Sequence, residues 1–152
     1  MAFQVSVFLE NKIGHLERIT SVLRAADINI RAMTLSHSTQ GWGILNLIVS
    51  NPQLACETLS DNKFSATLRE IAVIEMEDHP GGLDDLLKKI AAAEINFTNA
   101  YGRIVSPGKT AYLAIDVEDI GNCLEKLKKA GLKLISDDDV YCNGNPLVST
   151  KN

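Results

Sequence analysis

The sequence predicts an α+β protein built from two consecutive βαββαβ units, each an antiparallel sheet with its helices on one face. The main observation is an internal repeat, in which residues 3–35 align with residues 70–102 at a shift of 67 and the later parts at 68. Apolar residues also follow strand and helix periodicities along both copies. Because a repeated sequence indicates a repeated structural unit, we expect domains at 1–69 and 70–136, then a tail or extra edge strand at 137–152.

Each copy opens with a strand and an amphipathic helix. Alternate residues of the strand are apolar, which is typical of a strand packed on one side; these are Phe3, Val5, Val7 and Leu9, and then Ala72, Ile74 and Met76. The apolar residues that follow step by three, four and three positions in both copies, which predicts one buried helix face in each. The two stripes are Leu16, Ile19, Leu23 and Ala26, and Leu83, Leu86, Ile90 and Ala93.

A short loop joins the first strand of each copy to its helix. It contains Asn11 and Gly14 in the first copy, and Asp78, Pro80 and Gly81 in the second. Pro80 suits the first helical turn, where its missing N–H would have had no partner. Asn11 and Asp78 are residue types that accept a backbone N–H at a helix start, and the glycines allow a tight turn.

The second half of each copy contains two strands, a helix and a last strand, which completes the order of the ferredoxin-like fold. We expect the second strand to start near Ile28 and Ile95, and turns rich in glycine and serine at 38–43 and 106–109 precede the third strand. The remaining expected elements are a helix at Pro52–Leu59, a helix at Ile120–Ala130 that ends at Gly131, and fourth strands at 63–68 and 133–136.

The composition is that of an ordinary globular protein, with 45% hydrophobic and 22% charged residues. The first residues lack the features of a signal peptide, and no apolar run approaches the roughly 20 residues that a membrane helix needs. Cys56, Cys123 and Cys142 form no CxxC pair, which fits a reducing compartment, and the first two are expected to be buried structural thiols. We therefore expect a cytoplasmic protein with no membrane partner. The net charge of −4 argues against a nucleic-acid partner.

The residues that commonly carry catalysis do not form a recognisable set. The sequence contains neither a GxGxxG nor a GxxxxGK[ST] phosphate loop, and the expected central strands lack the stacked aromatic residues of RNA-binding sheets. His15, His37 and His79 are not at i, i+4 spacing; His15 and His79 are interpreted as solvated loop residues, and the acidic run at 137–139 as a solvated turn. We therefore expect no enzymatic activity, no cofactor and no metal ion.

The best candidate site is the repeated loop itself. A helix N-terminus presents N–H groups and a positive dipole end that can bind a carboxylate. Beside it, Asn11 or Asp78 could hold an ammonium group, and Asn29 or Asn96 at the start of the second strand could join them. An α-amino acid carries both groups. On these grounds alone, ligand binding and simple helix capping remain equal alternatives.

Taken together, the strand, the (N/D)xxG loop, the helix, and the following Ile28-Asn29-Ile30 or Ile95-Asn96-Phe97 resemble the ACT domain, a regulatory module of amino-acid metabolism. The resemblance covers residues 1–136 as two copies. It implies a module that binds amino acids or related ligands between ACT units, which often pair into an eight-stranded sheet. The ligand-binding residues that it implies are Asn11, Ile13, Gly14, His15, Asn29, Ile30, Asp78, Pro80, Gly81, Gly82, Asn96 and Phe97.

Two departures from the family pattern bear on the ligand. Leu9 and Met76 stand where serine-sensing members have a histidine, so serine is a doubtful ligand. Lys12-Ile13 replaces the usual Arg-Pro before the glycine, whereas the second copy keeps Pro80. The two loops are therefore expected either to differ in affinity or to include only one that binds.

Three functional hypotheses follow. The first is a non-catalytic regulatory protein, a homodimer that binds an amino acid at these loops and at ACT–ACT interfaces. The second is an interaction subunit that docks on a separate metabolic enzyme without a ligand of its own; Trp42, expected at a hairpin tip, is its candidate protein contact. The third, a small enzyme of the acylphosphatase kind, needs an arginine in the first loop and an asparagine on a neighbouring strand, for which Lys12 and Asn46 are poor substitutes.

Overall fold

A computed structural model of the chain describes residues 2–136 and 140. The chain divides into two compact units, Met1–Ile71 and Ala72–Asn152. The elements in chain order are β1 (Ala2–Glu10), α1 (His15–Ala25), β2 (Ile30–His37), β3 (Trp42–Val49), α2 (Pro52–Asp61), β4 (Ser65–Glu77), α3 (Gly82–Ala92), β5 (Asn99–Ser106), β6 (Thr110–Asp116) and α4 (Ile120–Lys129).

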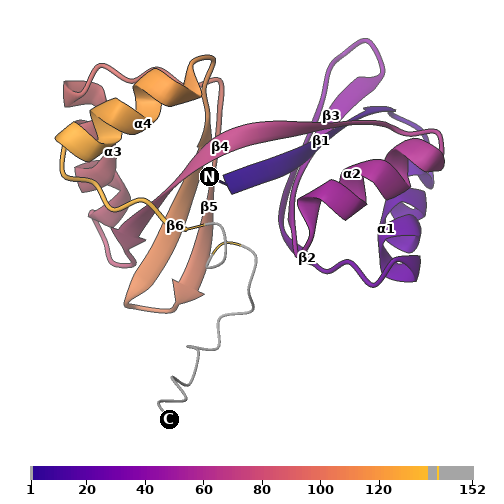
Figure 1. The fold of residues 1–152 in the computed structure, drawn as a ribbon, viewed down its shortest axis with the longest axis horizontal. Coiled ribbons are helices and arrows are strands. Elements are labelled where there is room, and N and C mark those ends of the chain that lie inside the picture. Colours follow the sequence, from indigo (N-terminus) through magenta and orange to yellow (C-terminus); the bar gives the residue numbers. More distant parts are fainter. Residues whose placement is uncertain (1, 137–139, 141–152) are drawn as a thin grey trace. The chain divides into compact units, whose positions relative to one another are not determined.

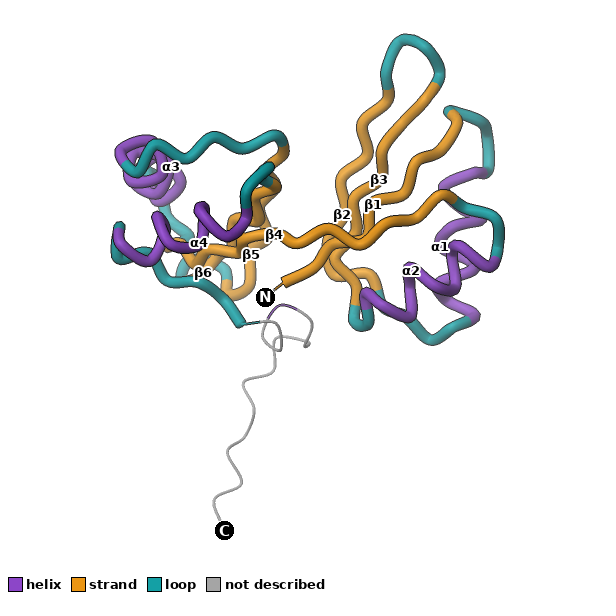
Figure 2. Tube along the Cα trace, turned by 45° about the horizontal axis from the view of Figure 1, so that its top comes forward, coloured by secondary structure: helices purple, strands orange, loops and turns teal. Residues whose placement is uncertain are grey.

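The first unit contains an antiparallel sheet in the order β2-β3-β1-β4. Val5 pairs with Leu47 of β3 on one side and with Leu68 of β4 on the other, which places β1 in the interior of the sheet. Helices α1 and α2 cover one face of this sheet (Figures 1 and 2). Their apolar stripes meet the alternating side chains of the strands, and the buried core contains Val5, Val7, Leu9, Ile19, Leu23, Leu45, Leu47 and Leu59.

The second unit repeats this arrangement with one element reduced. The strand order is β4-β6-β5, and α3 and α4 lie on one face (Figure 1). On the free side of β4, the expected fourth strand at 133–136 is only a bridge between Ile74 and Leu134. Two backbone hydrogen bonds flank that bridge, from Glu75 N to Lys133 O at 2.9 Å and from Ile135 N to Val73 O at 2.9 Å. The predicted α+β fold of two tandem ferredoxin-like units is therefore confirmed.

Strand β4 differs from the prediction because it joins two expected strands into one. The fourth strand of the first copy and the first strand of the second form a single element of 13 residues. Residues 65–71 pair with β1 and residues 72–77 pair with β6. Neither glycine nor proline interrupts 65–77, and each part has a strand to hydrogen-bond, so nothing ends the strand between the copies.

The second strand of each copy starts later than expected, at Ile30 and Asn99 instead of near Ile28 and Ile95. The cause is the helix C-terminus: the N–H of Ile28 donates to Leu23 O at 2.9 Å, and that of Ile95 donates to Ile90 O at 3.3 Å. Both residues are therefore still bonded to the helix before them.

The helix stripes lie where the periodicity placed them, with one exception. Ile19, Leu23, Leu86 and Ile90 are buried, whereas Leu83 is 46% exposed. Leu83 lies on the buried side of α3 by its helical angle, but it belongs to the first turn, beyond the packed core. The turn glycine Gly131 has φ of 70° directly after α4, as predicted.

Three smaller predictions concern cysteines and the tail. Cys123 is buried, but Cys56 is only half-buried against the core of the first unit. Cys142 and the acidic run at 137–139 lie outside the described residues, whereas Val140 is described and buried. None of the helices within residues 2–136 is long and apolar enough to cross a membrane.

Candidate ligand-binding site

The helices that follow the two candidate loops begin at glycines that adopt a left-handed conformation. Gly14 has φ of 84° and Gly81 has φ of 93°, and each is the N-cap residue of its helix. A residue with a Cβ is strained there, which explains glycine at both positions. The prediction that Asn11 and Asp78 cap these helices is therefore wrong, and so is the placement of Pro80 inside the first helical turn, because α3 starts at Gly82.

These two helices also differ from the other pair in how their N-termini are satisfied. Neither α1 nor α3 has a side chain that caps its first N–H groups. In contrast, Asn51 accepts a hydrogen bond from the N–H of Leu54 at the start of α2, and Asp119 accepts one from the N–H of Asn122 at the start of α4. The first N–H of each helix donates to its own loop, from His15 to Lys12 O at 3.2 Å and from Gly82 to His79 O at 3.0 Å. The next N–H groups, which no side chain caps, are therefore the ones that an external acceptor could reach.

Each candidate loop is tied to the hairpin of its own unit. The N–H of Asn11 donates to Gly41 O at 2.7 Å, and the N–H of Asp78 donates to Lys109 O at 3.1 Å. In the second unit the Asp78 Oδ2 also accepts the N–H of Gly108 at 2.7 Å. The Asp78 carboxylate therefore braces the β5–β6 turn, and at least one of its oxygens is already engaged.

A glutamate–cation pair lies at the start of both loops. In the first, Lys12 forms a salt bridge with Glu10, and this hydrogen bond is the main reason that the pKa of Glu10 is lowered. In the second, the ring of His79 bonds Pro80 O at 2.8 Å and Glu77 Oε2 at 2.7 Å. These two contacts, the backbone one first, raise the pKa of His79. The second loop therefore carries a histidine whose charge changes as the pH passes through its raised pKa.

Gly82, which the resemblance places among the ligand-binding residues, has a structural role. It is buried, and a Cβ at this position would lie 2.1 Å from the carbonyl oxygen of Glu77. His15 occupies the equivalent position in the first copy. At the tip of that loop Ile13 is fully exposed, so it contributes nothing to the core.

Asn29 and Asn96 lie at the opposite end of each unit from the loops. In the first unit Glu10 pairs with Trp42 at the start of β3, whereas Ile30 pairs with Val49 at its end. Seven residues of strand separate these pairs, or roughly 23 Å at 3.3 Å per residue. Asn11 and Asn29 therefore cannot touch one small ligand within the unit.

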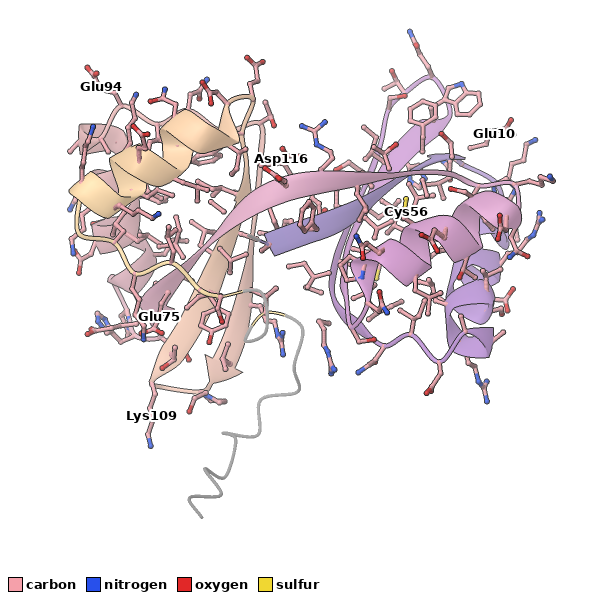
Figure 3. The ribbon with its side chains drawn as sticks, viewed as in Figure 1. Glu10, Cys56, Glu75, Glu94, Lys109 and Asp116 are labelled. Carbon is pink, nitrogen blue, oxygen red and sulfur yellow. The ribbon has the colours of Figure 1, made fainter. Side chains whose placement is uncertain are left out.

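The second unit shows the same separation. Glu77 pairs with Thr110 and Asn99 pairs with Asp116, at the two ends of β6. Figure 3 shows Lys109 and Glu94 at opposite ends of this unit. Asp78 is hydrogen-bonded to Lys109 and so lies at one end of the unit. Asn96 comes two residues after Glu94 and so lies at the other end.

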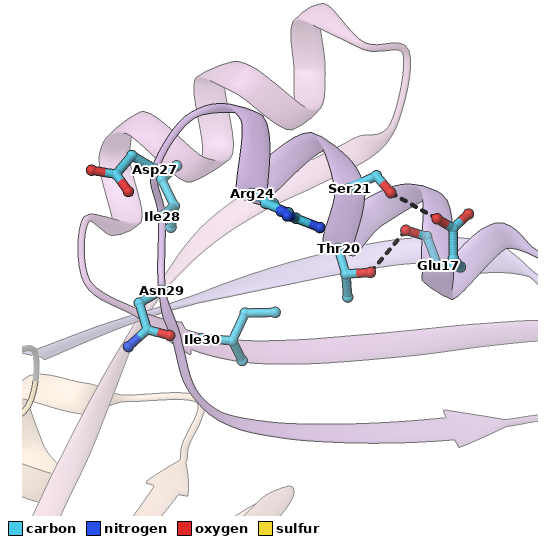
Figure 4. A pocket seen from close by; sticks show the side chains of 8 residues that line it. All are labelled: Glu17, Thr20, Ser21, Arg24, Asp27, Ile28, Asn29 and Ile30. Carbon is cyan, nitrogen blue, oxygen red and sulfur yellow. Dashed lines mark hydrogen bonds between the residues drawn. The ribbon is translucent and has the colours of Figure 1, made fainter.

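Each asparagine instead lines a hollow of its own. Asn29 and Ile30 border an open groove along α1, together with Glu17, Thr20, Ser21 and Arg24 (Figure 4). In that groove Ser21 Oγ donates to Glu17 Oε1 at 2.7 Å. Asn96 borders a smaller hollow with Thr98, Asp119, Asn122 and Lys126, and Lys126 Nζ donates to Glu94 O at 2.9 Å. Phe97 packs against the second core and does not line this hollow. Arg24 and Lys126 were not predicted from the sequence; Arg24 stands in the last turn of the helix that precedes Asn29, whereas Lys126 reaches the second hollow from α4, an element distant from Asn96 in the sequence.

Trp42 is the first residue of β3 and does not lie at the hairpin tip, contrary to expectation. Its ring stacks on Phe8 with centroids 5.1 Å apart. The histidines do not converge: among residues 2–136, no group of three or more metal-ligating side chains lies close enough to bind an ion.

A model of the family described as an ACT domain pair matches residues 1–142. The chain belongs to the ACT domain pair family. The match extends six residues beyond the 1–136 range on which the sequence resemblance was based.

Solved structures agree with this assignment. The ACT pair is similar to protein BT0572 from Bacteroides thetaiotaomicron, at 31% identity and a TM-score of 0.82 over 92% of this chain and 95% of that one. It has the fold of the ligand-free regulatory subunit of aspartate kinase from Thermus thermophilus, at 15% identity and a TM-score of 0.61 over 84% and 91% of the chains. The corresponding subunit from Thermus flavus gives 14% identity and a TM-score of 0.57 over 85% and 92%. Among curated proteins, none matches the sequence.

Proposed function

We propose that this ACT pair is a non-catalytic regulatory protein that binds an amino acid at the loops that precede α1 and α3. The observation that carries the proposal is the contrast between the four helix N-termini. Those of α2 and α4 are capped by Asn51 and Asp119, whereas those of α1 and α3 begin at Gly14 and Gly81 without a side-chain cap. The α-carboxylate of the ligand would accept hydrogen bonds from these N–H groups.

The ammonium group of the ligand needs a different partner. Asn11 is exposed beside the first helix terminus and carries a side-chain oxygen for this purpose, whereas Asp78 already accepts a hydrogen bond from Gly108. We therefore assign the tighter binding to the first loop. Asn29 cannot touch a ligand at the first loop, nor Asn96 one at the second, from within its own unit, because each lies at the far end of that unit. The proposal includes a homodimer, in which another copy of the chain could bring an asparagine to the loop.

A thermal-shift screen against the twenty amino acids at millimolar concentration tests the proposal. A ligand at 100 times its Kd adds about 2.7 kcal/mol of stability, which raises Tm by roughly 5–10 °C in a chain of this size. The absence of a shift with every amino acid would contradict the proposal.

A variant pair locates the site. Gly14→Asp places a negative charge where the carboxylate should bind, and aspartate tolerates a left-handed conformation better than most residues. The matched control is Gly131→Asp, because Gly131 has φ of 70° and, like Gly14, no atom within 4 Å of an added Cβ. The ligand-induced shift should disappear in the first variant and persist in the second, each measured against its own ligand-free Tm.

The second candidate function is docking on a separate metabolic enzyme without a ligand. It is favoured by the side chain of Ile44, which is 47% exposed on the sheet face opposite α1 and α2. This alternative would be excluded if the protein purified from its native cell extract without a partner and if an amino acid raised its Tm.

A further inference from the structure

The first unit contains a hollow of about 350 Å³ at the end of β1, lined by Phe8, Trp42 and Phe64. The centroids of the Phe8 and Trp42 rings lie 5.1 Å apart and the rings are only 13° from parallel, so they stack on each other and each keeps an outer face. Their side chains are 49% and 43% exposed. Stacked aromatic rings that stay in water are a surface that another planar group can cover favourably.

Positive charges surround this aromatic surface. The hollow is also lined by Lys12, Arg18 and Lys63, against one carboxylate, that of Glu10. With histidine neutral, these residues sum to +2, in a chain whose net charge is −4. Lys12 pairs with Glu10, so the uncompensated charge belongs to Arg18 and Lys63.

Both of these cations are positioned at the hollow. The Arg18 guanidinium lies 5.1 Å from the centre of the Phe64 ring, a cation–π contact that orients the side chain. Lys63 follows α2 with φ of 68°, a conformation that disfavours any residue with a Cβ. Within the described part of the chain, neither has a carboxylate partner.

The second copy serves as an internal control for what the fold requires. The repeat places Glu75 opposite Phe8, Thr110 opposite Trp42, Asp85 opposite Arg18 and Gly131 opposite Lys63. Gly131 makes the same turn as Lys63, with φ of 70°. The second copy therefore folds without an aromatic pair and without cations at these positions, and it has the unstrained glycine where the first copy has lysine. The fold alone thus does not explain why the first copy has Phe8, Trp42, Arg18 and Lys63.

We propose that this hollow binds a small organic anion with a planar apolar body, of the aryl carboxylate class. The ring would stack on an outer face of the Phe8–Trp42 pair, and the anionic group would lie between Arg18 and Lys63. The ligand needs no ammonium group, so this proposal does not depend on the amino-acid site proposed above, although Lys12 and His15 beside that loop also line the hollow.

The single tryptophan of the chain makes the test direct. In a ¹H–¹⁵N spectrum of the full-length protein, the one indole N–H resonance belongs to Trp42. Benzoate should shift this resonance saturably, and benzamide, its neutral isostere, should bind about tenfold more weakly because it loses the attraction of two cations, each contributing a few-fold. Cyclohexanecarboxylate, which has the charge without the planar ring, should also bind more weakly. Raised salt should weaken benzoate binding.

Two substitutions then locate the anionic subsite. Arg18→Gln and Lys63→Gly, the latter introducing the residue of the second copy, should each weaken benzoate binding about threefold, and together about tenfold. Lys88→Gln, which removes an exposed lysine of the second unit, is the matched control and should leave binding unchanged. The proposal is overturned if benzoate leaves the Trp42 resonance unmoved, if benzamide binds equally well, or if the double variant binds like the wild type.

Discussion

Replacing Gly82 by alanine should destabilise the second unit through one backbone clash. The new Cβ would lie 2.1 Å from the carbonyl oxygen of Glu77, whereas real Cβ atoms essentially never approach closer than 3.0 Å. The main chain must therefore move by 0.9 Å, the difference between those two distances. Glu77 is held by its pairing with Thr110, and Gly82 by its N–H bond to His79 O at 3.0 Å, so neither side moves freely.

The size of the effect follows from two opposing terms. Overpacking of this kind costs about 3 kcal/mol, and alanine recovers about 1 kcal/mol of helix propensity relative to glycine. The expected net loss is about 2 kcal/mol, which lowers Tm by roughly 4–8 °C. Differential scanning calorimetry measures this loss, and hydrogen exchange of the α3 amides assigns it to the second unit.

The matched control is Gly121→Ala near the start of α4. There the nearest atom to an added Cβ is Asp119 Oδ1, at 3.7 Å, which is an ordinary contact. This variant should gain about 0.5–1 kcal/mol, because only the loss of chain entropy in the unfolded state acts. If Gly82→Ala proved as stable as Gly121→Ala, the assignment of a structural role to Gly82 would be wrong.

Three further predictions concern single side chains. Hydrogen bonds to Pro80 O and Glu77 raise the pKa of His79. The stability that His79 contributes relative to His79→Gln should therefore be complete below the ordinary histidine pKa of about 6.5 and be lost as the pH rises through the raised pKa. A difference in urea stability that stays constant across this pH range would contradict the prediction. Asp78→Ala removes the acceptor of the Gly108 N–H and should cost about 1 kcal/mol and accelerate exchange of that amide, whereas Asn11→Ala at the equivalent position should cost less. Burial raises the pKa of the Cys123 thiol, so mass spectrometry after alkylation should find Cys123 modified more slowly than the half-buried Cys56, and equal rates would refute this.

Much of the fold could be predicted because it depends on local pattern. Ile19 and Leu23 share a helix face with the same spacing as Leu86 and Ile90, and all four are buried. Periodicity indicates which side of an element is apolar, so it predicted the burial of these four side chains correctly. It does not report where an element stops: Leu83 has the right direction but lies beyond the core.

The candidate site could be predicted only in part. The pairing of a loop glycine with a helix start was visible in the sequence, and Gly14 and Gly81 do precede α1 and α3. The choice of Asn11 and Asp78 as caps followed residue preference and was wrong, because both loops are one turn longer than a simple cap and the side chain of Asp78 is directed to Gly108. Capping preferences describe an isolated helix end, and here the neighbouring hairpin supplies the competing partner.

The sequence by itself determined the repeated order of strands and helices, since the spacing of apolar residues and the positions of glycine are properties of short segments. Only the tertiary structure decided which distant residues meet. It separated Asn11 from Asn29 by the length of β3, although both had been assigned to one site. It also brought Phe8, Trp42 and Lys63 around a single hollow. The physical reason is strand register: hydrogen bonding between strands fixes which ends of the sheet coincide, and no local pattern in the sequence contains that information.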